Sequence, residues 1–288
     1  MRILIAVDKH EYSGYIIQQA SALAENTWAE ITLLGIHRAG LPNSENALVS
    51  LSNTLDTYRR AFIHHFKDME SPYGPADVPY QLMERKKSVF DQVYEGPEGR
   101  KNFNVRIRCG NAGKEILAES VESDTDLIVI GCTKGQGCKW IDDADVQHAI
   151  VKDAQCSVLV IKEDKEPQMI VCCLDHDQVS QASVELINQL VTFYKVDLEL
   201  VGVTEKNRLK DEVDHKMAQI VNHYADCDIR AWVKLVDAPS LNSFVVQSAE
   251  KNLVVLWMGK ESFLDKIFSR QRLAQLAATA ESSMLILR

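Results

Sequence analysis

The sequence predicts an α/β protein built from two doubly wound domains, each with a five-stranded parallel sheet. Two apolar runs repeat with fixed spacing: ILIAVD, which ends at Asp8, recurs as MIVCCLD, which ends at Asp175, at an offset of 167. Further along, DLIVIG matches NLVVLW and SVLVIK matches SMLILR, both at an offset of 126. A repeat of this length indicates duplicated domains rather than a solenoid of small units. Short runs rich in Val, Ile and Leu, separated by segments with helical spacing, are typical of buried parallel strands.

Composition limits the classes of function. The chain has 288 residues, 46% of them apolar and 25% charged, which is the balance of a globular protein with room for two domains. No apolar stretch is long enough to span a bilayer, and the start, MRILIAVDKHE, carries no signal-peptide pattern. Seven cysteines without a CxxC pair fit reduced thiols. We therefore expect a cytoplasmic protein with no membrane partner, and the net charge of -9 argues against a nucleic-acid partner.

The first half alternates strands and helices in the order of a doubly wound domain. Its predicted strands are five apolar runs, IAV, TLLGI, VRIRC, LIVI and VLVI, within residues 3–8, 32–36, 105–109, 127–130 and 158–161. The segment from Ser13 to Glu25 is a predicted helix because apolar residues recur there at helical intervals, namely Ile16, Ala20, Leu23 and Ala24. Between the third and fourth strands, Ile116, Leu117 and Val121 predict another helix. Right-handed crossovers leave few topologies other than a doubly wound sheet.

An insert separates the second and third strands of the first half. The offset falls from 167 to 126, so this half carries 41 residues more than the other. A long amphipathic helix that covers the sheet is predicted by the apolar positions Leu48, Leu51, Leu55, Tyr58, Phe62 and Met69. The remainder, around residues 71–103, contains SPYGPADVPY, a charged segment through Arg85, Lys86 and Lys87, and GPEG. A lid, a partner surface and a loose excursion are all open interpretations of this segment.

The second half repeats the same order. Its strands are predicted near residues 169–174, 198–203, 229–235, 252–257 and 283–287. The segment EDKEP, from Glu163 to Pro167, is charged, contains a proline and joins the halves. We therefore expect one domain over residues 1–163, with the insert around 71–103, and a second over residues 168–288.

These features resemble the universal stress protein family, and the two halves together resemble a tandem member. The resemblance rests on the aspartate that ends the first strand and on the glycine-containing loop after the fourth. Nucleotide-binding members carry G-x2-G-x9-G-[ST] in that loop, followed by a helix and a last strand of the PVLVV type. Here Gly131 supplies the first glycine, and the run from Val146 through HAIVKDAQCSVLVIK matches the helix and the last strand. The resemblance implies the adenine nucleotide alpha hydrolase-like fold, a Rossmann-like arrangement, and a role in the stress response.

The middle of the glycine motif departs from the family. Lys134 stands at the second glycine position, with Gly135 and Gly137 just beyond it, and Ala144-Asp145 replaces the Gly-[ST] pair. Glycines in such a loop let backbone N–H groups approach phosphate oxygens, and alanine crowds that approach. A carboxylate at position 145 repels a polyphosphate, although Lys134 offers a compensating cation.

The second half loses the phosphate motif altogether. Trp257 stands at the first glycine, Lys260 at the second, and Arg270-Gln271 at the Gly-[ST] pair. We expect the indole to block a phosphate at the end of the fourth strand. Asp175 remains, but a capping or turn aspartate beside His176 and Asp177 explains it equally well.

If a ligand binds, the topological switch point of the first half is where we expect it. The family resemblance implies that Asp8 contacts the adenosine part of ATP or AMP and that Ile36 lies beside the adenine. The phosphates would then meet Gly131, Lys134, Gly135 and Gly137. No catalytic group is assigned, because DKHEYSGY lacks the SGGxDS loop of related pyrophosphatase-type enzymes. No metal is expected either, since Cys132 and Cys138 near His148 do not have a usual zinc spacing.

The last strand of each half is an apolar edge strand by the predicted order, SVLVIK in one and SMLILR in the other. Bare apolar edges invite pairing, and single-domain members of the family dimerise through this strand. We therefore expect an intramolecular pseudo-dimer, with a homodimer and an unknown protein partner as further associations. Two functions stay open. One is a stress-response binding or adaptor module with degenerate nucleotide motifs, and the other is an ATP or AMP sensor, or slow ATPase, that uses the first half.

Overall fold

The computed structural model describes residues 1–10, 12–38, 44–66, 71–132, 140, 145–162, 166–173, 181–204, 211–258 and 263–288. The chain divides into two compact units, Met1–Glu163 and Asp164–Arg288, and each is described by itself. In the part of the chain covered by these ranges, none of the helices combines the length and the apolar character needed to cross a membrane.

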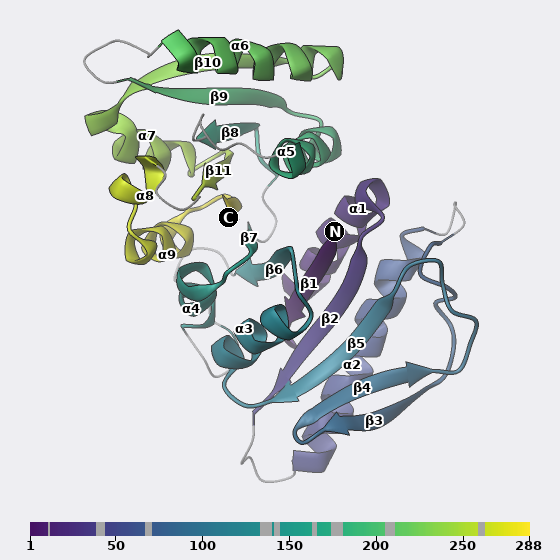
Figure 1. The fold of residues 1–288 in the computed structure, drawn as a ribbon. Helices are drawn as coiled ribbons and strands as arrows, with labels where there is room; N and C mark the ends of the chain where they lie inside the picture. Colours follow the sequence, from purple (N-terminus) through teal and green to yellow (C-terminus); the bar gives the residue numbers. More distant parts are fainter. Residues whose placement is uncertain are drawn as a thin grey trace. The chain divides into compact units, whose positions relative to one another are not determined.

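Unit 1 has a mixed sheet with helices on both faces. Figure 1 shows α1 and α2 behind the sheet and α3 and α4 in front of it. The strand order is β7-β6-β1-β2-β5-β4-β3, and only the last two strands run antiparallel to their neighbours. The elements in chain order are β1 (Arg2–Val7), α1 (Tyr12–Thr27), β2 (Glu30–His37), α2 (Ser44–His64), β3 (Tyr80–Lys86), β4 (Val89–Tyr94), β5 (Phe103–Cys109), α3 (Ala112–Glu122), β6 (Leu127–Cys132), α4 (Val146–Asp153) and β7 (Ser157–Lys162).

Unit 2 has a parallel sheet with the strand order β10-β9-β8-β11-β12. Its elements are β8 (Met169–Cys173), α5 (Gln181–Tyr194), β9 (Asp197–Thr204), α6 (Asp211–Asp226), β10 (Ala231–Asp237), the 3-10 turn η1 (Ala238–Ser240), α7 (Leu241–Ser248), β11 (Leu253–Trp257), α8 (Phe263–Ile267), α9 (Arg270–Thr279) and β12 (Met284–Leu287). All five predicted strands of this half are present within two residues of the expected positions. The predicted pairing between the last strands of the two halves stays a prediction.

Buried apolar side chains hold the parallel core of unit 1 together, as the sequence predicted. Every residue of β1 from Ile3 to Val7 is buried. The predicted stripe of α1, from Ile16 to Ala24, packs against the sheet. In α2, Leu51, Leu55 and Phe62 are buried, whereas Met69 lies outside the described residues. Burial of such side chains is the dominant favourable term for folding.

The predicted helix before β6 is present as α3, but its predicted face is partly wrong. Val121 is 68% exposed, whereas the buried positions include Ile116 and the carboxylate of Glu119, which is 0% exposed. A charged side chain therefore occupies part of the stripe that covers the sheet. An acidic residue is rarely assigned to a buried stripe because isolated buried charge is costly.

The insert forms a β-hairpin that widens the sheet. Strands β3 and β4 pair antiparallel from Tyr80↔Tyr94 to Lys86↔Val89, and β4 pairs antiparallel with β5 from Gln92↔Val105 to Val89↔Arg108. The Gln92 side-chain amide also donates to the Ser52 carbonyl of α2 at 2.7 Å. The hairpin is therefore neither a lid nor a loose excursion. It adds two antiparallel strands to the five parallel strands that the sequence predicted.

Candidate functional site

Asp8 lies directly after β1, where the carboxyl ends of β1, β2 and β6 meet. Its side chain is buried and accepts hydrogen bonds from described residues of the chain itself. One oxygen accepts from the Tyr12 hydroxyl at 2.7 Å, and the other accepts from the Ser13 hydroxyl and the His10 backbone N–H, both at 3.0 Å. Both carboxylate oxygens thus help to fix the turn into α1. A ligand hydroxyl would have to compete with these donors.

Helix α2 closes over the same strand end. The Tyr58 hydroxyl donates to the Asp8 backbone carbonyl at 3.3 Å, and burial raises the pKa of Tyr58. The Lys9 ammonium donates to the Ser50 hydroxyl at 2.9 Å. At the end of β2, burial and the charge of Lys9 lower the pKa of His37, so its imidazole is neutral at pH 7 and adds no cation for a phosphate.

Gly131 is explained by packing between α1 and β6. A Cβ atom built on Gly131 would lie 2.0 Å from Cδ1 of Ile16 and 2.8 Å from the Tyr12 ring. The glycine therefore lets the first turns of α1 lie against the end of the strand. Ile36, the other predicted contact, is half-buried near the end of β2 and opposite Arg108 of β5. Three predicted site positions, Asp8, Ile36 and Gly131, thus lie on or directly after neighbouring strands.

Most positions of the predicted phosphate loop are not among the described residues. Lys134, Gly135, Gly137 and Ala144 lie outside the described residues. Asp145 is exposed, stands immediately before α4, and does not cap that helix with its side chain. A carboxylate there occupies the positive end of the helix, where a phosphate would otherwise be favoured.

In unit 2, Trp257 is the last residue of β11 and is 6% exposed. It lies opposite Leu287 of β12. The indole thus occupies the strand end where unit 1 has Gly131. Arg270 and Gln271 begin α9, after the N-cap Ser269. Lys260, Asp175, His176 and Asp177 lie outside the described residues.

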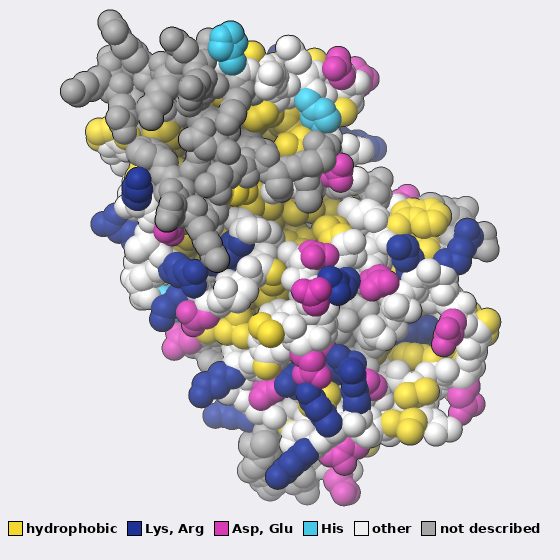
Figure 2. All heavy atoms as spheres, viewed as in Figure 1, with side chains coloured by type: hydrophobic (Ala, Val, Ile, Leu, Met, Phe, Trp, Pro, Cys, Tyr) yellow, Lys and Arg dark blue, Asp and Glu magenta, His cyan; other side chains and the backbone are white. Residues whose placement is uncertain are grey.

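A buried ion cluster between α3 and β5 was not predicted from the sequence. Glu119 accepts from Arg106 at 2.5 Å and from Arg108 at 2.9 Å. Arg108 also donates to Glu115 at 2.8 Å and to Glu122 at 3.0 Å. Figure 2 shows acidic and basic side chains lying next to one another over this part of unit 1. The signal was visible as alternate arginines in VRIRC and carboxylates at helical spacing in α3.

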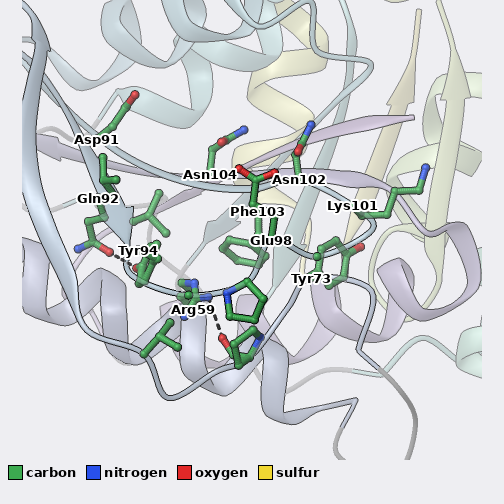
Figure 3. A pocket seen from close by; sticks show the side chains of 17 residues that line it. Arg59, Tyr73, Asp91, Gln92, Tyr94, Glu98, Lys101, Asn102, Phe103 and Asn104 are labelled. Carbon is green, nitrogen blue, oxygen red and sulfur yellow. Dashed lines mark hydrogen bonds between the residues drawn. The ribbon is translucent and has the colours of Figure 1, made fainter.

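The hairpin also lines an open cavity of about 290 Å3 on the side of β5 that faces β4. Figure 3 shows the side chains around it, with Arg59 of α2 next to Tyr94 of β4. Residues of the insert supply most of the lining: Tyr73, Pro75, Val78, Asp91, Gln92, Val93, Tyr94, Gly96, Pro97, Glu98, Gly99, Lys101 and Asn102. The Gly-Pro pairs in SPYGP and EGPEG were the sequence signal for the turns that shape it. Elsewhere in the described ranges, His, Cys, Asp and Glu side chains form no group of three suited to a metal ion.

Residues 1–162 match the sequence model of the universal stress protein family, which is more than half of the chain. The chain belongs to the universal stress protein family. This match confirms the predicted resemblance of the first half to the family. No curated protein sequence matches the chain.

Three solved structures resemble this universal stress protein in fold. A universal stress protein from Archaeoglobus fulgidus is 12% identical, with a TM-score of 0.59, over 100% of this chain and 96% of the other. A Pseudomonas aeruginosa protein of unknown function is 13% identical, with a TM-score of 0.54, over 99% and 92% of the chains. The cytoplasmic domain of a prokaryotic cation chloride cotransporter is 11% identical, with a TM-score of 0.51, over 99% and 94%. At these identities the likeness shows the fold alone.

Proposed function

We propose that this chain is a tandem universal stress protein that acts as a stress-response binding or adaptor module, with degenerate nucleotide positions in both units. The observation that carries the proposal is the carboxylate of Asp8, to which the chain's own Tyr12, Ser13 and His10 donate hydrogen bonds on both oxygens. The packing role of Gly131 and the buried Trp257 support it further. None of these residues forms a nucleophile and base pair, so we assign no catalysis.

The tandem arrangement is supported by a packing detail that recurs in both units. Gly35 of β2 lies under α2, where an added Cβ would be 2.9 Å from Cδ1 of Leu55. Gly202 of β9, at the offset of 167, lies under α6, where an added Cβ would be 2.9 Å from Sδ of Met217. The same close approach of helix to strand at equivalent positions is what a duplicated domain predicts.

An ATP or AMP sensor is the second candidate. It is favoured by the placement of Asp8, Ile36 and Gly131 at the carboxyl ends of adjacent parallel strands, where ligands of open α/β sheets bind. In that case Lys134, Gly135 and Gly137 supply the phosphate contacts. The two candidates differ in whether Asp8 can exchange its internal hydrogen bonds for those of a nucleoside.

Calorimetric titration of the full chain with ATP, ADP and AMP separates the candidates. The adaptor proposal expects no binding heat and no thermal shift at ligand concentrations of about 1 mM. Micromolar ATP binding that is lost in Asp8→Asn would overturn it. Tyr12→Phe provides a sharper test, because it removes the hydroxyl that donates to the Asp8 carboxylate at 2.7 Å. If the internal hydrogen bonds of that carboxylate are what excludes adenosine, Tyr12→Phe gains weak binding that the unaltered chain lacks.

A further inference from the structure

The cavity beside β5 exists because two strands diverge. The pairing of β4 with β5 ends at Gln92↔Val105, whereas the pairing of β4 with β3 continues to Tyr80↔Tyr94. On the other side, β5 stays paired with β2 as far as Phe103. The segments after Gln92 and before Val105 therefore separate, and the space between them forms most of the cavity.

Two loops close this space, and their backbones are packed against each other. A Cβ atom built on Gly99 would lie 2.4 Å from the carbonyl oxygen of Pro72, and the Lys101 backbone N–H donates to that same oxygen at 2.8 Å. The Tyr73 hydroxyl donates to the Ala29 carbonyl at 2.7 Å, which ties one loop to the sheet. The cavity is thus formed before any ligand enters, which reduces the entropic cost of binding.

Arg59 places a buried positive charge in the cavity wall. The side chain is 4% exposed, and its guanidinium donates to the carbonyl oxygens of Ala76 at 3.0 Å and Pro75 at 2.9 Å. The guanidinium carbon lies 3.8 Å from the centre of the Tyr94 ring. Its Nε–H has no hydrogen-bond partner, and none of the described carboxylates forms an ion pair with Arg59. A guanidinium stays protonated in proteins, and the nearby carboxylates of Asp56 and Asp77 stabilise its charge without an ion pair to it, so the unpaired polar group at this wall is the Nε–H.

The other charges around the cavity are either compensated or on its rim. Both oxygens of Asp91 are held by Arg106, at 2.6 and 3.1 Å. Glu98 is exposed on the closing loop, and Lys101 lines the opposite part of the wall. The apolar wall includes the rings of Tyr73 and Phe103, whose centres are 5.7 Å apart. The wall therefore offers a ligand one buried, unpaired N–H donor on a cation, next to an aromatic surface.

We propose that this cavity binds a small organic carboxylate, with the anionic group toward Arg59 and a flat apolar body against the aromatic wall. A carboxylate fits better than a phosphate for two reasons. Two guanidinium N–H groups of Arg59 already donate to backbone carbonyls, so fewer donors remain for phosphate oxygens. Glu98 also repels the second negative charge of a phosphate. The volume of about 290 Å3 is just below the usual range for ligand pockets, about 300–1,000 Å3, so the ligand is small. This site is separate from the switch point around Asp8.

Benzoate is a suitable probe, and the Arg59 Nε–H resonance of the 15N-labelled full chain is a direct reporter. We expect that resonance to shift saturably during a benzoate titration up to about 10 mM, whereas benzyl alcohol, which has the same ring without the charge, leaves it unchanged. No shift with benzoate, an equal shift with benzyl alcohol, or tighter binding of inorganic phosphate than of benzoate would overturn the proposal.

Neighbouring residues supply matched variants for calorimetry. Arg59→Lys should weaken benzoate binding about tenfold or more, because it removes the forked donor. Arg60→Lys is the control, since Arg60 pairs with Asp56 and Asp77 and does not line the cavity. Glu98→Gln should tighten binding several-fold by removing the repulsive charge at the rim. Unchanged affinity in both Arg59→Lys and Glu98→Gln, with both variants folded, would contradict the proposal.

Discussion

The third parallel strand in chain order has a different environment in the two units: β5 is paired on both sides, whereas β10 is paired on one side among the described strands. In unit 1, β5 lies between β2 and β4, and its Arg106 and Arg108 are buried at 7% exposure. In unit 2, β10 pairs with β9 alone among the described strands, and its Leu235 is 56% exposed. An open strand edge is a liability that proteins cover, charge or shorten. The comparison teaches that one parallel architecture accepts either a covered or an open outer strand.

Each unit also buries a carboxylate near this strand, but with different partners. Glu119 of α3 is bound by Arg106, Arg108 and Ser123. Glu199 of β9 accepts from the Trp232 indole at 3.0 Å and lies 3.7 Å from the Lys234 ammonium, which is half exposed. The first cluster is enclosed by protein, whereas the second reaches water. Electrostatic interactions are stronger away from solvent, so the two carboxylates should differ in energetic weight.

The largest expected effect is therefore at Glu119. Glu119→Ala leaves two buried guanidinium groups without their shared carboxylate, and we expect it to lower the free energy of unfolding by about 3–5 kcal/mol. Glu199→Ala is the matched change in unit 2 and should cost about 1–2 kcal/mol. Urea unfolding measures both, and hydrogen exchange assigns the loss to a unit. An equal loss of unfolding free energy in the two variants would contradict the expected difference between the two carboxylates.

The ends of the central strands offer a second contrast, between Gly131 of β6 and Trp257 of β11. Because the Cβ of Gly131→Ala would collide with Ile16, we expect this variant to cost about 1–3 kcal/mol of unfolding free energy. Adding Ile16→Val should recover part of that loss by removing the colliding methyl group. Thermal denaturation of the single and double variants checks the coupling.

Gly14 is the control for that experiment. It lies within α1 with nothing within 4 Å of an added Cβ, so Gly14→Ala should stabilise the protein by about 0.5–1 kcal/mol through helix propensity. If Gly131→Ala were as harmless as Gly14→Ala, Gly131 would not be a packing glycine. A role of Gly131 in ligand binding would then be the better explanation of this glycine.

A smaller effect is expected from acid titration of the cluster in unit 1. Hydrogen bonds from Lys86 and Arg108 lower the pKa of Glu122 to about 2, from an ordinary value of 4.5. A depressed carboxylate pKa stabilises the folded state above pH 4.5, and that contribution is lost as the pH falls from 4.5 toward 2. The stability difference between the unaltered chain and Glu122→Gln should therefore shrink over this window. A difference that stays constant in urea titrations from pH 6 to pH 3 would contradict the assignment.

The smallest effect concerns local opening rather than global stability. Backbone amides of β10 that point away from β9 should exchange with solvent faster than those of β5, because β5 has a hydrogen-bonded neighbour on each side. Hydrogen exchange resolved by residue measures this. Equal protection of the two strands would mean that the edge of β10 is covered in solution.

The parallel strands could be predicted because their apolar runs are short, nearly continuous and duplicated. The hairpin could not, since β3 is exposed at most positions and shows no apolar alternation. Its position depends on contacts far apart in the sequence, such as Asp91 with Arg106 and Gln92 with Ser52. For the site, the sequence located Asp8 at the switch point. Its internal hydrogen bonds depend on the geometry of Tyr12 and Ser13, which no pattern of residue types reveals.

The salt-bridged contact between Asp91 and Arg106 has a consequence for how this chain can be edited. A chain trimmed of residues 71–102 would come within nine residues of the second half in length, yet it would lose the acidic group that the hairpin contributes to β5. Arg106 would then keep Glu119 of α3 as a described partner, and Glu119 would still be shared with Arg108. Removing the extra segment therefore takes one carboxylate out of a charge cluster that spans the hairpin, β5 and α3.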